Sequence, residues 1–147
     1  MDAIKSTVGR KIPDTIQKNL ASLAKTHLKE EGFDLTGDPR EILQIIDTFA
    51  LKMHNDLETI LTSEKSDEII QGAAIEMASL IVELVKIDKK CVALWFYDQK
   101  TFGENNFPLL INDNYVIFPM GWVIKRILDG KAESVVSKYN QTVESKF

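Results

Sequence analysis

Of all the side chains in the sequence, two histidine–glutamate pairs come nearest to the residue types and spacing of a metal site. His27 precedes Glu31 by four residues, and His54 precedes Glu58 by four. Residues four apart lie on one face of a helix, so two such pairs on facing helices would make a metal-binding helical protein. Di-iron bundles use another order, with histidine three residues after glutamate and further glutamates from neighbouring helices. We expect no metal and no other cofactor, and keep metal binding by these four residues as an alternative.

The single cysteine, Cys91, is the one candidate for a thiol nucleophile. It opens the apolar stretch 91–97, whereas a reactive thiolate needs a helix N-terminus or a basic, partly exposed pocket. A small core thiol is therefore the expected role of Cys91. The sequence also contains no Walker-type loop, no G-x-G-x-x-G and no G-x-S-x-G. We predict that the chain is not an enzyme.

Three N-terminal helices are predicted to position these side chains. The first begins at Pro13 and ends near Gly32, and the second begins at a capping sequence, with Asp38 as N-cap, and continues to about residue 62. The third, residues 66–87, is apolar around most of its circumference, which is typical of a core helix. We expect its side chains Met77, Ile81 and Leu84 to be inaccessible to solvent.

A small sheet and one or two C-terminal helices are predicted to follow. Residues 91–97 are rich in aromatic and β-branched types, and residues 109–111 and 115–118 flank an Asn-Asp-Asn turn, so the three segments predict an antiparallel meander. Apolar spacing predicts a helix over 122–128 and a weaker one over 131–144. The predicted fold is α+β, with residues 1–147 in a single globular domain.

Charge is unevenly distributed along the chain. The whole sequence has 18 basic and 22 acidic residues, a net charge of −4, yet residues 30–84 contain thirteen of the acidic residues and three of the basic ones. The pI of about 5.2 argues against a nucleic-acid partner, since the basic residues Lys125, Arg126 and Lys131 make only a sparse group. No apolar run is long enough to cross a bilayer, and the N-terminus lacks a signal peptide. We expect a cytoplasmic protein with no membrane partner.

An acidic domain without catalytic motifs is most simply a protein that binds another protein. Clustered carboxylates suit a basic partner, so an inhibitor of the bacterial immunity-protein or antitoxin type is the leading hypothesis. A secretion or assembly chaperone and a regulatory adaptor remain alternatives. The candidate partner-binding residues are Glu58, Glu64, Asp67, Glu68, Trp95, Tyr97, Asp98 and Glu104.

Two surfaces are therefore candidates. Glu58, Glu64, Asp67 and Glu68 crowd the turn between the second and third predicted helices. The strand at 91–97 is apolar on both faces, unlike a strand with one wet face. Either the C-terminal helices cover its aromatic side through Trp122, Ile127 and Val135, which we favour, or that side is open to a partner or to a second copy in a homodimer.

Overall fold

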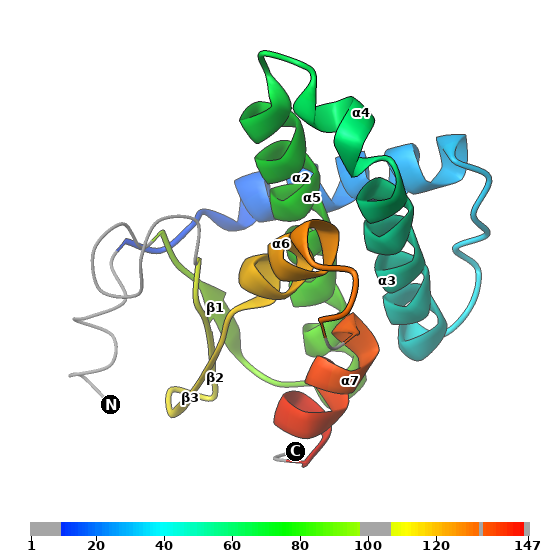
Figure 1. Ribbon diagram of the computed structural model, residues 1–147. Coiled ribbons are helices and arrows are strands. Elements are labelled where there is room, and N and C mark those ends of the chain that lie inside the picture. Colours follow the sequence, from blue (N-terminus) through cyan, green and yellow to red (C-terminus); the bar gives the residue numbers. More distant parts are fainter. Residues whose placement is uncertain (1–9, 98–106, 133, 146–147) are drawn as a thin grey trace.

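The computed structural model describes residues 10–97, 107–132 and 134–145. Helices surround one long helix, α5, and a three-stranded antiparallel sheet lies to one side of them, which confirms the α+β class (Figure 1). The elements are, in chain order, α2 (Asp14–Glu30), α3 (Pro39–Asn55), α4 (Leu57–Leu61), α5 (Ser66–Lys89), β1 (Ala93–Trp95), β2 (Leu109–Ile111), β3 (Tyr115–Ile117), α6 (Pro119–Leu128), α7 (Val135–Tyr139) and the π-helix η1 (Asn140–Glu144).

Helix α5 forms the centre of the core. Its residues Met77 and Ile81 are fully buried and Leu84 is almost so, as expected from the apolar spacing. It packs chiefly against α2 and α6, and it also contacts α3 and β1. The helix ends at Lys89, and the next residue, Lys90, takes the left-handed conformation with a φ of 49°. Glycine more often fills such a position.

The predicted second helix is two helices, so four rather than three precede the sheet in the described part of the chain. Asp38 is the N-cap of α3, as predicted, and its side chain accepts a hydrogen bond from the Glu41 amide. The chain then bends at Asp56 before the short α4. The bend allows Leu57 and Ile60 to pack against the core. Neither glycine nor proline marks it, so the apolar spacing alone predicted a continuous helix.

The sheet has the predicted meander order, β1-β2-β3, with both pairs antiparallel. Asn112 and Asp113 adopt φ angles of 50° and 63° in the hairpin turn, the left-handed values that a tight turn requires. The outer edge of β1 is also occupied, because the Ile12 amide donates to the Trp95 carbonyl. This pairing, with the bridge between Lys11 and Phe96, brings residues 10–12 onto the sheet.

The C-terminal helix differs from the one predicted over 131–144. It begins at Val135, after Ser134 as N-cap, and changes at Asn140 into the π-helix η1. Tyr139 is fully buried, and its hydroxyl donates a hydrogen bond to Asp88 at the end of α5. Glu144 forms ion pairs with Arg40 and Lys89. The polar ends of α3 and α5 thus fix the end of the chain against the core.

Tyr139 should resist ionisation as long as the protein is folded. Burial, reinforced by the hydrogen bond to Asp88, raises the pKa of Tyr139 well above its ordinary range. The pKa of Tyr139 is higher in the folded protein than in the unfolded chain, so the buried, protonated hydroxyl contributes to stability. That contribution is complete below pH about 10, the pKa of a free tyrosine, and is lost as the pH rises above it. In an alkaline titration followed by tyrosinate absorbance, Tyr139→Phe should leave the signal of the folded state unchanged. A loss of one tyrosine from that signal would contradict the expectation.

Candidate protein-binding surface

Four predicted site residues lie together where α4 leads into α5. Glu58 is on α4, Glu64 is in the connecting turn, and Asp67 and Glu68 are in the first turn of α5. All four side chains are exposed. Figure 1 shows this connection at one end of the molecule, opposite the end where the C-terminus lies. We call these four residues the acidic turn.

The carboxylates of the acidic turn have no ion-pair partner within the residues that the structure describes. Asp67 and Glu68 sit at the positive end of the α5 dipole, which is a favourable place for negative charge. Exposed carboxylates contribute little to folding. Their charge therefore remains available to attract a positively charged molecule.

An apolar groove of about 680 Å³ lies beside the acidic turn, between α3, α4 and α5. Phe49, Ile60 and Ala73 are half-buried on its surface, and Ile69 is 44% exposed. We call it the α3–α5 groove. Its lining residues are Glu31, Phe49, Lys52, Met53, Asp56, Thr59, Ile60, Ser63, Ile69 and Ala73.

The acidic turn flanks this groove. Glu58, Glu64 and Glu68 are each a direct chain neighbour of a residue that lines it. The groove itself contains one cation, Lys52, among the lining residues, and Glu31 neutralises that cation in an ion pair that raises the pKa of Lys52. Lys65, exposed in the same turn, offsets one of the four carboxylates. The surface thus combines apolar contact area with a net negative charge.

The histidines are engaged in other contacts. His27 Nδ1 lies 2.7 Å from Glu76 Oε2, and His54 Nδ1 lies 2.8 Å from the Ile127 carbonyl oxygen, to which it can donate. Glu31, proposed as a partner of His27, pairs with Lys52 instead. Within the described residues, no three His, Cys, Asp or Glu side chains are grouped so that they could hold a metal ion. The structure does not bring the two predicted pairs together as a site.

Cys91 has the surroundings of a packing residue. Its side chain is half-buried, and Sγ lies 3.9 Å from the Val85 carbonyl oxygen. Burial raises the pKa of the Cys91 thiol, and the nearby Lys86 and Lys89 only partly oppose that effect. A raised pKa lowers the thiolate fraction at neutral pH. The environment therefore does not activate this cysteine.

The aromatic side of β1 is covered at Trp95. This residue is 2% exposed, and its indole N–H donates to the Phe107 carbonyl at 3.0 Å. Tyr97 is half-buried, with its ring edge-on to Phe107 and the Arg10 guanidinium 5.3 Å from its centroid. Trp95 thus offers no contact surface in the monomer. Asp98 and Glu104, the other predicted residues here, lie outside the described part of the chain.

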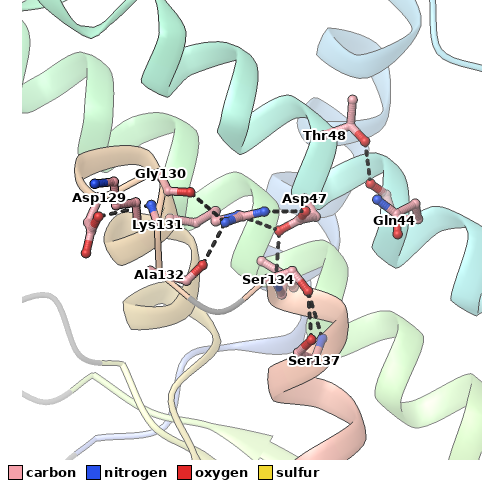
Figure 2. Close-up of polar contacts among 11 residues, drawn as sticks. Gln44, Asp47, Thr48, Asp129, Gly130, Lys131, Ala132, Ser134 and Ser137 are labelled. Atoms are coloured by element: carbon pink, nitrogen blue, oxygen red, sulfur yellow. Dashed lines mark hydrogen bonds and ion pairs between the residues drawn. The ribbon is translucent and has the colours of Figure 1, made fainter.

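A buried ion pair between Asp47 and Arg126 is a feature that sequence reasoning missed. Arg126 Nε donates to Asp47 Oδ1 at 3.0 Å, and the Val135 amide donates to the same oxygen at 2.9 Å. The other end of the guanidinium donates to the carbonyls of Gly130 and Ala132 (Figure 2). These contacts join α3, α6 and the start of α7 at one point.

This ion pair corrects the interpretation of Arg126 as part of a weakly basic surface. Its side chain is only 12% exposed and that of Asp47 only 4%. One feature of the sequence indicated a buried charge, namely that Asp47 follows Ile46 on the buried side of a helix. Nothing local indicated Arg126 as its partner, because the two residues are 79 positions apart. We infer that the pair stabilises the fold and is not part of the binding surface, because its polar atoms are hydrogen-bonded within the chain.

No family model, curated protein or solved structure matches this chain. Among the described residues, no helix is both long and apolar enough to span a membrane. The surface formed by the acidic turn and the α3–α5 groove is the candidate functional site.

Proposed function

We propose that this chain is a non-enzymatic protein-binding domain that neutralises a basic protein, in the manner of an immunity protein or antitoxin. The observation that carries the proposal is the acidic turn, whose four exposed carboxylates have no ion-pair partner among the described residues. Three of the four are chain neighbours of residues that line an apolar groove. We propose no catalytic role, because His27 and His54 contact Glu76 and the Ile127 carbonyl, and burial raises the pKa of the Cys91 thiol.

The two parts of this surface would make different contributions to binding. Unpaired carboxylates accelerate encounter with a cationic partner and select against acidic proteins. Large apolar and aromatic side chains in a pocket supply most of the affinity in protein interfaces. The large residues of that kind that line the groove are Phe49, Met53, Ile60 and Ile69. An inhibitor of a basic enzyme needs both fast association and slow release.

Affinity isolation tests the proposal. We expect the immobilised chain to retain one basic protein from its source cells in near-stoichiometric amount, and we expect added salt to weaken the retention, because screening reduces attraction between exposed charges. Mass spectrometry identifies the retained protein, and an assay of its activity with and without the chain tests neutralisation. Retention of an acidic protein that is insensitive to salt would contradict the proposal.

A further inference from the structure

We propose that the α3–α5 groove receives a basic amphipathic helix of the partner protein. This inference rests on the proposed function and specifies how the partner is recognised. The groove supplies an apolar floor, and the acidic turn supplies negative charge at its border.

The walls of the groove favour a helix over an extended segment. Seven of its ten lining residues lie on the helices α3, α4 and α5, and the other three, Glu31, Asp56 and Ser63, lie at helix ends or in a turn. The backbone groups of the three helices are bonded within each helix, so they provide no free strand edge to which an extended peptide could add. An amphipathic helix can instead place its apolar ridge between two helices, with anchor residues at i, i+3, i+4 and i+7.

The size of the groove sets the length of helix that it can hold. Its lining runs from Phe49 on α3 to Asp56, the residue that follows this helix, and along α5 from Ile69 to Ala73. At a rise of 1.5 Å per residue, the α3 side is about 10 Å long, or about two helical turns. Two or three apolar side chains on one face of a helix match that length.

The charge at the border selects the partner. Asp56 lines the groove, and Glu58, Glu64 and Glu68 are chain neighbours of lining residues. A seated helix with lysine or arginine beside its apolar face would therefore lie close to opposite charges. A second copy of the chain would bring the same acidic border against itself. Opposing carboxylates would weaken that contact, so the occupant is a basic helix of another protein.

A synthetic peptide serves as the probe. It carries leucine at i, i+3, i+4 and i+7 and lysine at the other positions. One control peptide has the same composition with the leucines distributed around the helix, and another replaces every lysine by glutamate. In a heteronuclear NMR titration, the first peptide should shift the amide signals of Ile60, Ile69 and Ala73 most strongly and bind more tightly than both controls.

Two matched variants locate the contact. Ile69 and Ile87 are both exposed isoleucines on α5, but only Ile69 lines the groove. Ile69→Gln should weaken binding of the first peptide about tenfold, which is the scale of losing one apolar anchor. Ile87→Gln should change the affinity for the first peptide by less than about twofold, because Ile87 lies outside the groove. Circular dichroism verifies that both variants remain folded.

The outcomes separate the two proposals. If the distributed peptide binds as well as the amphipathic one, or if Ile69→Gln binds like Ile87→Gln, the groove inference fails while the acidic turn can still bind a basic protein. Equal binding of the glutamate peptide would overturn both proposals, because charge would then play no part. Absence of binding by any peptide, or dimerisation of the chain through the groove seen by sedimentation, would overturn the groove inference alone.

Discussion

Asp47→Ala is expected to lower the free energy of unfolding by about 3–5 kcal/mol, the range found when one member of a buried ion pair is removed. The variant leaves the Arg126 guanidinium without its carboxylate in a site where that side chain is only 12% exposed. It also leaves the Val135 amide without its acceptor at the start of α7. Denaturant unfolding followed by circular dichroism gives the change.

The exposed ion pair between Glu31 and Lys52 provides the control for this experiment. Their side chains are 41% and 52% exposed, so Glu31→Ala should cost less than about 1 kcal/mol. A double variant, Asp47→Leu with Arg126→Met, should lose less than the single Asp47→Ala, because no buried charge is left unpaired. A loss below about 1 kcal/mol for Asp47→Ala would show that the pair does not hold α3, α6 and α7 together.

Ile81→Ala is expected to cost about 2–5 kcal/mol in the same measurement, through lost burial and the cavity that remains. Ile81 is fully buried on α5, the helix that contacts α2, α3, α6 and β1. Ile87→Ala is the matched control on the same helix. Because Ile87 is 62% exposed, its replacement should change the free energy of unfolding by less than about 0.5 kcal/mol. Equal effects of the two variants would mean that α5 is not the centre of the core.

The features of the fold that could be predicted are those that depend on residues close together in the sequence. The apolar spacing of α5, the Asp38 N-cap and the hairpin turn at Asn112 and Asp113 each depend on a few neighbouring positions. The acidic turn was predictable for the same reason, because its four carboxylates are close in the chain.

The features that the sequence did not reveal depend on distant segments. The bend at Asp56 has no glycine or proline signal, and it follows from packing of α4 against the core. The pairing of Asp47 with Arg126 and of the Ile12 amide with Trp95 joins residues 79 or more positions apart. The α3–α5 groove exists only once three helices have packed, so no local pattern could have indicated it.

If the acidic turn contacts a basic partner, its charge should control the rate of association with the isolated partner. Two double variants raise the net charge equally. Glu64→Gln with Glu68→Gln changes the acidic turn, whereas Gln44→Lys with Gln141→Lys changes exposed residues on α3 and η1. Each is compared with the unmodified chain by stopped-flow measurement over a range of salt concentrations.

The acidic-turn variant should associate roughly three to ten times more slowly at low salt and show a shallower salt dependence, since the charges that steer the encounter are reduced. The control variant should stay close to the unmodified chain, because its added charges lie away from the acidic turn. Equal rates and equal salt dependence for the two variants would contradict contact through the acidic turn, because only the overall charge would then matter.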